Sequence, residues 1–181
     1  LLLERGYEAL HGAGHRRASL EGSTVGVAIG ISYTEFAQVL ATGPHAKSVY
    51  AVTASTLSIA SGRLSFALGL QGPCLAVETA CSASLVALHS AMRAVQHKDC
   101  DVHLTAGVNM MLVPSTPHTL AVAGMTSARG RSHTFDDRAD GFARGEGCTA
   151  AVLQRANGAD GLRLEGVAVR QDGRSASLTA P

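Results

Sequence analysis

The spacing of apolar and polar residues along the chain predicts alternating helices and strands. Apolar residues recur at helical intervals in three segments: Leu1–Leu10, Thr53–Leu68 and Ser82–Gln96. Gly69 is placed to end the second of these helices. In the third, one apolar face is predicted from Leu85, Leu88, Met92 and Val95. Short apolar runs predict strands over Thr24–Ser32, Cys74–Thr79, Asp101–Val108, Thr149–Arg155 and Leu162–Arg170.

The order of these elements predicts an α/β fold in one domain or part of one. The helix over Ser82–Gln96 joins two strands, and this βαβ order implies that they pair in parallel. The last two strands are joined by Asn157–Gly161, whose composition is typical of a hairpin, so the tail is expected to be antiparallel. Residues 33–48 are mixed, with a turn at Gly43-Pro44, and residues 114–138 are predicted to be loop with a short helix.

Composition and charge narrow the class of protein. The chain is 46% hydrophobic and 16% charged, with a formal net charge of +1, which gives no electrostatic case for binding nucleic acid or an anionic membrane. No apolar stretch reaches the ~20 residues that a membrane span needs. The four cysteines form no CxxC pair, which favours free thiols in a reducing compartment, and we expect a cytoplasmic location. The chain begins without Met and ends abruptly, which suggests a fragment of a longer protein.

Cys81 is the candidate nucleophile. A strand is predicted to end just before it and a helix to begin directly after it. Helix N-termini carry unpaired N–H groups and a partial positive charge, which favour a thiolate over a thiol. A backbone N–H at this turn can also face an oxyanion on an attacked carbonyl. The alternative is a packed cysteine, because strand-to-helix turns are common and Cys is often a buried small residue.

A family resemblance supports the nucleophile. The run Thr79-Ala80-Cys81-Ser82-Ala83-Ser84, followed by Leu-Val-Ala-Leu-His, resembles the active-site signature of β-ketoacyl synthases, with Glu78 and Ala83 replacing the usual Asp and Ser. Further stretches resemble the family in the same order: 60–73, 106–109, 135–147, 171–175 and 178–181. The last two are similar to type I polyketide synthases, although Arg170 and Ala176-Ser177 depart from the usual residues. The resemblance covers essentially the whole chain.

The resemblance implies a thiolase-like fold, of which residues 1–181 would be the first, N-terminal half of a two-half α/β architecture. It implies that Cys81 accepts an acyl chain from the phosphopantetheine of an acyl carrier protein, with no directly bound cofactor and no metal. Decarboxylative Claisen condensation with a malonyl-type extender would follow, supported by two histidines and a lysine. Those histidines belong to His-Gly-Thr-Gly-Thr and Asn-x-Gly-His motifs, which this sequence lacks. Further implied partners are other polyketide synthase domains in the same chain and a second copy, in a homodimer.

Other residues are weaker candidates. His89 follows Cys81 by eight residues, roughly 12 Å of helical rise, which is too far for a direct hydrogen bond. His118 and His133 lie in the irregular stretch, and the remaining histidines are interpreted as surface residues: His11, His15, His45, His97 and His103. Ser82 and Ser84 are expected to cap the nucleophile helix.

Two loop features have alternative interpretations. Arg144-Gly145-Glu146-Gly147 superficially resembles a phosphate cradle, but a strand follows it, so a tight loop near the active site is preferred, with Glu146 orienting backbone. Asp136, Asp137 and Asp140 lack the spacing of an EF-hand, which favours a solvated or Arg-paired loop over a cation site.

Rival functions remain open at this point. A fatty-acid synthase ketosynthase or a thiolase would share the fold, although the segment Gln171–Ser175 favours the polyketide kind. A decarboxylating loading variant would carry Gln at the position of Cys81. A non-elongating ketosynthase-like domain would bind acyl groups without condensing them, and residues beyond this sequence would decide between the two.

Overall fold

The fold is built on a four-stranded sheet. The computed structural model describes residues 1–44, 46–155 and 162–174. The strands lie in the order β2-β1-β3-β4, and their bounds are β1 (Gly26–Gly30), β2 (Cys74–Val77), β3 (Val102–Asn109) and β4 (Gly147–Gln154). β1 pairs in parallel with both β2 and β3, whereas β4 is antiparallel to β3. The carboxyl ends of β1, β2 and β3 therefore meet at one edge of the sheet, where β4 begins.

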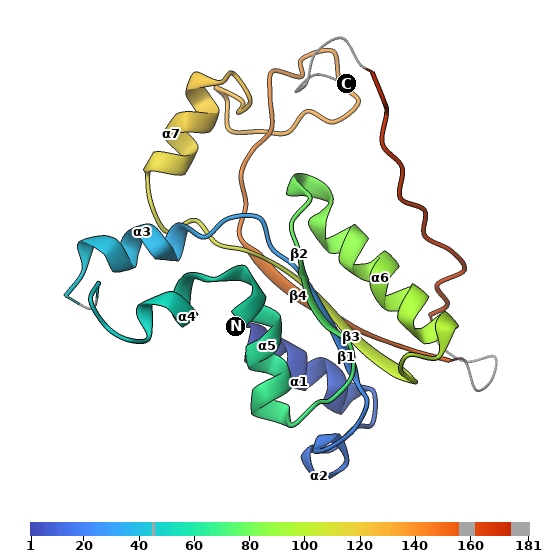
Figure 1. Ribbon diagram of the computed structural model, residues 1–181. Helices are drawn as coiled ribbons and strands as arrows, with labels where there is room; N and C mark the ends of the chain where they lie inside the picture. The colour runs from blue at the N-terminus through green and yellow to red at the C-terminus, as the bar shows by residue number, and fades with distance from the viewer. Residues whose placement is uncertain (45, 156–161, 175–181) are drawn as a thin grey trace.

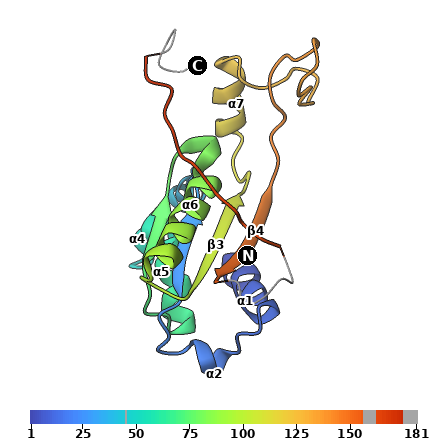
Figure 2. The same cartoon turned by 90° about the vertical axis from the view of Figure 1, so that its right-hand side faces the viewer.

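Helices cover both faces of this sheet (Figures 1 and 2). The helices of the described residues are α1 (Leu2–Gly12), α2 (Arg17–Leu20), α3 (Glu35–Thr42), α4 (Ala51–Ser55), α5 (Leu57–Leu68), α6 (Ala83–His97) and α7 (Ser115–Val122), with a 3₁₀ turn η1 (Ala80–Ser82) before α6. α6 packs on one face, and α1 and α5 pack on the other. Among the residues described, no helix combines the length and apolarity that crossing a membrane would require.

The main core lies between the sheet and the α1–α5 face. Its fully buried members include Leu10, Leu64, Ile29 and Leu104. All five residues of β1 are buried, because this strand is central in the sheet and has helices on both faces. The α/β class is thus borne out, and the central strand explains the continuous apolar run at Thr24–Ser32.

Most predicted elements are present, with changes at their ends. The helix predicted over Thr53–Leu68 is two helices, because Thr56 is extended (φ −89°, ψ 128°) between α4 and α5. Gly69 ends α5 in the left-handed conformation (φ 71°), as predicted. The short helix expected within 114–138 is α7, whereas α3 lies in the stretch that the sequence left mixed.

Two predictions about the sheet are wrong. The strands on either side of α6 are parallel but do not pair, because β1 lies between β2 and β3. Leu162–Arg170 is not a strand, and β4 pairs with β3 instead, so the predicted hairpin does not form. The residues predicted to make its turn, 157–161, lie outside the described part. Figures 1 and 2 show residues 162–174 running alongside α6 instead, and the His89 Nδ1–H donates to the carbonyl of Val167 (3.2 Å).

The predicted apolar face of α6 is only half correct: Met92 and Val95 are buried, whereas Leu88 is half-buried and Leu85 is exposed. Leu85 is 61% exposed, and the residues of α6 that are buried include Ala83, Ala87, Ala91 and Ala94. These alanines, three or four residues apart, form a narrow stripe that lets the helix approach the sheet closely. Large side chains were a poor guide in the first half of α6, which begins close to the sheet over Gly30 and Gly107.

His103 is buried, which corrects its interpretation as a surface residue. It is fully buried on β3, next to Gly26, where a β-carbon would come within 2.4 Å of the imidazole. Its Nδ1–H donates to the carbonyl of Leu104 (3.0 Å). Burial lowers the pKa of His103 from its ordinary value of 6.5. The imidazole is therefore a neutral core group in the folded chain at neutral pH.

Candidate active site

Cys81 lies at the carboxyl edge of the parallel strands, where a cavity of about 480 Å³ opens. The cavity is lined by residues from five segments: 30–33 after β1, 80–84 around the start of α6, 107–109 at the end of β3, Leu120 of α7, and 142–149 around the start of β4. In open α/β sheets this edge is the usual place for ligands. Cys81 is exposed and lines the cavity, so its thiol is accessible to a substrate.

A strained turn carries the candidate nucleophile. Ala80, directly before Cys81, has φ 50°, a left-handed conformation that non-glycine residues rarely adopt. Two hydrogen bonds hold it there: the Ala80 N–H donates to the Glu78 carboxylate (2.8 Å), and the Ser32 hydroxyl donates to the Ala80 carbonyl (2.8 Å). Strain of roughly 1–3 kcal/mol persists only where surrounding contacts impose it, and such sites cluster at functional positions.

Two glycines on the strands beneath α6 allow the helix to begin close to the sheet. Gly30 and Gly107 are register partners on β1 and β3. A β-carbon on Gly30 would lie 2.4 Å from the Ser84 nitrogen, and one on Gly107 would lie 2.8 Å from the Ser84 Cβ. Only glycine therefore allows the start of α6, with Cys81 just before it, to sit directly over the strand ends.

The expected serine caps are absent. Ser82 occupies the N-cap position of α6 but makes no side-chain capping bond. Its hydroxyl instead donates to the carbonyl of Thr79 (2.9 Å), which tightens the η1 turn. Ser84 lies inside the helix, over Gly107. The first amides of α6 are thus not capped by these hydroxyls.

The opposite wall of the cavity is the loop before β4. Asn109 at the end of β3 donates to the carbonyl of Gly145, and the Met111 N–H donates to the Glu146 carboxylate (2.7 Å). The structure confirms that this segment is a loop in which Glu146 orients backbone, and the loop lines the cavity that contains Cys81. It is not a phosphate cradle, because β4 follows it at Gly147.

A buried ion pair behind this wall was missed by sequence reasoning. Arg144 Nη2 lies 3.0 Å from Glu35 Oε1, and their side chains are 8% and 3% exposed. Glu35 Oε2 also accepts the N–H groups of Leu112 (2.6 Å) and Val113 (3.1 Å). Burial raises the pKa of Glu35, but these hydrogen bonds, one from Thr116 and the Arg144 guanidinium outweigh it, so its pKa lies below 4.5. Glu35 is therefore a charged group that joins α3, the exit of β3 and the loop before β4.

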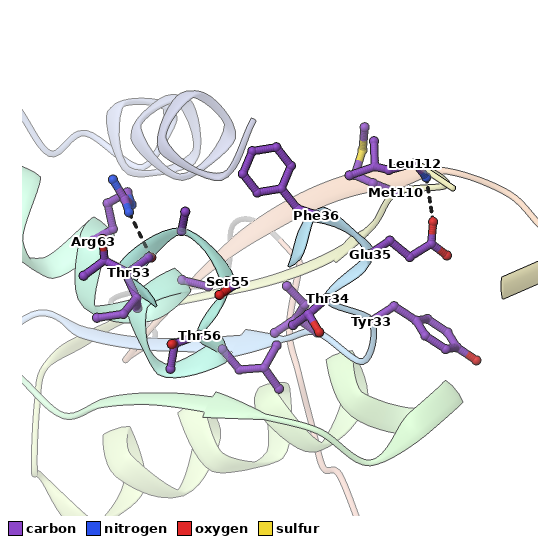
Figure 3. A pocket seen from close by; sticks show the side chains of 15 residues that line it. Tyr33, Thr34, Glu35, Phe36, Thr53, Ser55, Thr56, Arg63, Met110 and Leu112 are labelled. Carbon is purple, nitrogen blue, oxygen red and sulfur yellow. Dashed lines mark hydrogen bonds between the residues drawn. The ribbon is translucent and has the colours of Figure 1, made fainter. Parts of the chain in front are cut away.

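A second, smaller cavity of about 190 Å³ adjoins the first and is shown in Figure 3. Ile31 and Tyr33 line both cavities. Phe36, Met110 and Leu112 give the second cavity an apolar side, and the Arg63 guanidinium donates to the Thr53 carbonyl at its other end (3.2 Å). The two cavities are neighbours that share the turn after β1.

The remaining candidate residues are not among those that line the Cys81 cavity. Neither His118, exposed on α7, nor half-buried His133 is among the residues that line it in the described part of the chain. Asp136 pairs with Arg138 (2.6 Å) and Asp140 with Arg129 (3.1 Å), which confirms the Arg-paired interpretation of this loop. The hydrogen bond from Arg138 holds the pKa of Asp136 well below its usual range.

The other cysteines differ from Cys81 in their surroundings. Cys100 is buried and Cys148 is half-buried, and burial raises the pKa of both thiols. Cys74 is exposed at the first position of β2, away from the lining of the cavity. Of the four thiols, Cys81 is the one that lines the cavity.

Comparisons with known proteins agree with this arrangement. Residues 1–159 match the family model of the beta-ketoacyl synthase N-terminal domain. The chain is 40% identical to a mycocerosic acid synthase-like polyketide synthase of Mycolicibacterium smegmatis and 42% identical to a phenolphthiocerol/phthiocerol polyketide synthase of Mycobacterium tuberculosis. Both matches span 100% of this chain but only 9% and 12% of those relatives.

Solved structures give the same family. A ketosynthase from module 6 of the bacillaene synthase of Bacillus subtilis is 35% identical with a TM-score of 0.76, over 85% of this chain and 26% of that one. A Streptomyces albus oxazolomycin ketosynthase domain is 34% identical with a TM-score of 0.77, over 85% of this chain and 27% of that one. The expected thiolase-like α/β fold is thereby confirmed. The chain belongs to the beta-ketoacyl synthase family and corresponds to its N-terminal domain.

Proposed function

We propose that Cys81 is the acyl-accepting nucleophile of a polyketide synthase ketosynthase. The observation that carries this proposal is the exposed thiol at a strained turn, directly before α6 and facing a cavity at the strand ends. The thiolate attacks the carbonyl of an incoming thioester. A new S–C bond forms at Cys81, the bond to the donor sulfur breaks, and the donor leaves as a thiol after taking up a proton. The relatives named as polyketide synthases support this assignment.

The condensation that follows is part of the same proposal. A malonyl-type extender loses carbon dioxide, and its carbanion attacks the acyl group on Cys81, forming a carbon–carbon bond and releasing the thiol. Both substrates are carried on the phosphopantetheine of an acyl carrier protein, so no directly bound cofactor is required. Decarboxylation needs donors that stabilise the developing enolate, and the histidine motifs of the family are not within these 181 residues.

The chain would then be the N-terminal portion of a ketosynthase domain, spanning residues 1–181, within a longer synthase that carries other polyketide synthase domains. The small fraction of each polyketide synthase relative that it covers supports this. The four free thiols support a reducing, cytoplasmic location.

The test compares the formation of ketoacyl product by the full-length synthase and by its Cys81→Ala variant. The variant loses ketoacyl product entirely, whereas a Cys148→Ala control, changed at a half-buried thiol outside the cavity lining, keeps product formation near the wild-type rate. Full turnover by Cys81→Ala would contradict the proposal. Acyl loading without product or carbon dioxide release in the wild type would instead indicate a non-elongating acyl-binding domain. A preference for fully reduced acyl chains throughout would indicate a fatty-acid ketosynthase.

A homodimer through β2 is proposed as well. β2 pairs only with β1 among the described strands, so its outer edge has backbone groups without a strand partner. Its side chains Leu75 and Val77 are half-buried rather than fully covered. An edge of this kind is suited to pairing with the same edge of a second copy.

Charges at this edge test the dimer. Leu75→Asp with Val77→Asp is expected to dissociate or misfold the full-length protein in analytical ultracentrifugation, because buried carboxylates would face one another. Val77→Thr, close in shape and uncharged, serves as the control and is expected to remain dimeric. A wild-type protein that is monomeric and active would refute the dimer.

A further inference from the structure

The chain between β3 and β4, residues 110–146, forms an arm that contributes no residue to the hydrophobic core of the described part of the chain. α7 lies within this arm and has no buried residue. Figures 1 and 2 show α7 and the loop after it standing away from the sheet. Because such a segment buries little apolar surface, polar contacts at its two ends must fix its position.

One carboxylate holds both ends of the arm. Glu35 Oε2 accepts the N–H groups of Leu112 (2.6 Å) and Val113 (3.1 Å), where the arm leaves β3. Glu35 Oε1 lies 3.0 Å from Arg144 Nη2, where the arm returns to β4. Figure 3 shows the Glu35 side chain, at the start of α3, turned toward Leu112. Because this side chain is 3% exposed, water competes little with these bonds.

The arm carries part of the wall of the cavity that contains Cys81. Leu120 of α7 and Phe142 line this cavity with apolar side chains. Both residues lie between the two ends that Glu35 holds, and neither belongs to the core clusters of the described residues. The Phe142 N–H donates to the Met125 carbonyl (3.1 Å), inside the arm, so Phe142 moves with the arm. The position of this wall therefore depends on Glu35.

We propose that Glu35 is a positioning residue for acyl transfer to Cys81, because it fixes the arm whose Leu120 and Phe142 form an apolar wall for the acyl chain. This inference rests on the proposed function of Cys81. The substrates that depend on Glu35 are thioesters of long apolar acyl chains, which fill the cavity as far as this wall. An acetyl group occupies little of the cavity and does not depend on the wall. Glu35 acts through the arm, without contacting the thiol.

Acyl loading of Cys81 in the full-length synthase tests this role. Acetyl and decanoyl thioesters of N-acetylcysteamine are offered to the wild type and to Glu35→Gln, and kcat/KM for acylation of Cys81 is measured by mass spectrometry. A glutamine side chain has one acceptor oxygen, so it can hold one end of the arm but not both. We expect kcat/KM for decanoyl transfer to fall about tenfold, the effect of a lost apolar contact in a pocket, and acetyl transfer to be unchanged. A general loss of folded protein would lower both equally.

The matched control is Asp140→Asn, which breaks a carboxylate–arginine pair inside the arm, with Arg129 (3.1 Å), rather than at its ends. This control is expected to keep the wild-type ratio of decanoyl to acetyl transfer. Phe142→Ala, which removes part of the wall but leaves Glu35 in place, is expected to reproduce the selective loss.

Three results would overturn the positioning role and leave the role of Cys81 intact. The first is an unchanged ratio of decanoyl to acetyl transfer in Glu35→Gln or in Phe142→Ala. The second is an equal selective loss in Asp140→Asn. The third is a wild type that transfers acetyl but not decanoyl groups, because no long chain would then use the wall.

Hydrogen exchange of backbone amides in the wild-type synthase gives a second readout, which needs no variant. The Leu112 and Val113 amides are expected to exchange more slowly than those of the exposed loop 128–138, because Glu35 protects the ends of the arm. If Glu35→Gln does not fold, this pattern decides: slow exchange at Leu112 and Val113 supports the inference, and exchange as fast as in the loop overturns it. If Cys81 of the wild type accepts neither thioester, the proposed function fails and this inference with it.

Discussion

At the scale of single residues, the position of the nucleophile depends on the absence of side chains beneath it. Gly30 and Gly107 leave space for Ser84 at the start of α6. Glu78 and Ser32 then fix the left-handed Ala80 that turns the chain toward Cys81. Substituting the glycines should therefore affect the thiol as well as the stability of the fold.

Gly30→Ala is expected to destabilise the protein and to slow alkylation of Cys81. The new methyl group would lie 2.4–2.6 Å from backbone atoms of Ala83 and Ser84, which cannot move aside as a flexible side chain would. Overpacking of this kind costs about 1–3 kcal/mol. The control is Gly62→Ala, in the middle of α5, where nothing lies within 4 Å; it should stabilise by roughly 0.5–1 kcal/mol. Denaturant unfolding measures both changes in stability. Equal effects of the two substitutions would contradict the claim that position 30 must be glycine for α6 to begin over the strand ends.

Single residues also show what the sequence could and could not predict. The candidate role of Cys81 was accessible because its motif is continuous and helix N-termini have known chemistry. The packing of α6 on Gly30 and Gly107 was not, because it depends on the register of two strands that are far apart in the sequence. Glu35 and Arg144 are likewise 109 residues apart, and neither has a local pattern that marks it as one half of a buried pair.

At the scale of elements, Glu35 joins three segments around the cavity: the start of α3, the exit of β3 and the loop before β4. Its lowered pKa has a consequence for stability. A carboxyl group whose pKa is lower in the folded than in the unfolded chain stabilises the fold above the unfolded value, and this contribution is lost as the pH falls through the folded value.

Comparison of the wild type with Glu35→Gln over pH isolates this contribution. The difference in the free energy of unfolding is expected to be full above about pH 4.5 and to shrink as the pH falls below it. Breaking a buried ion pair by removing one partner costs about 3–5 kcal/mol, so the neutral-pH difference should be of that order. Denaturant titrations from pH 3 to pH 7 would measure it, and a difference independent of pH would show that the Glu35 charge does not stabilise the fold.

Helices and strands were predicted correctly where the local sequence pattern determines them. Predictions failed where tertiary packing determines which face of an element is buried. Helical spacing and Gly69 predicted the end of α5, and the apolar run predicted β1. The apolar face of α6 was predicted from Leu85, Leu88, Met92 and Val95, of which Met92 and Val95 are buried, but the prediction missed the buried alanines between them. His103 lies on β3, a strand whose middle is buried on both faces, so no alternation of polar and apolar residues could reveal that it is buried.

At the scale of the whole molecule, the 181 residues hold the candidate nucleophile but not the histidine motifs that the proposed condensation requires. Expressed alone, this chain is expected to give no ketoacyl product and no release of carbon dioxide from a malonyl carrier protein. Removing one oxyanion-type donor typically costs about 10²–10³ in rate, and here two are absent. Turnover near that of the full-length synthase would show that the complete machinery lies within these residues.

The central claim is that Cys81 carries the acyl group, and mapping the acylated residue tests it most directly. The full-length synthase is incubated with an acyl carrier protein that bears a neutral acyl thioester, digested under acidic conditions, and analysed by mass spectrometry. We expect the acyl mass on the peptide that contains Cys81, its loss in Cys81→Ala, and none on Cys100 or Cys148, where burial raises the thiol pKa. Acylation of Cys74, Cys100 or Cys148 with Cys81 unmodified would contradict the assignment.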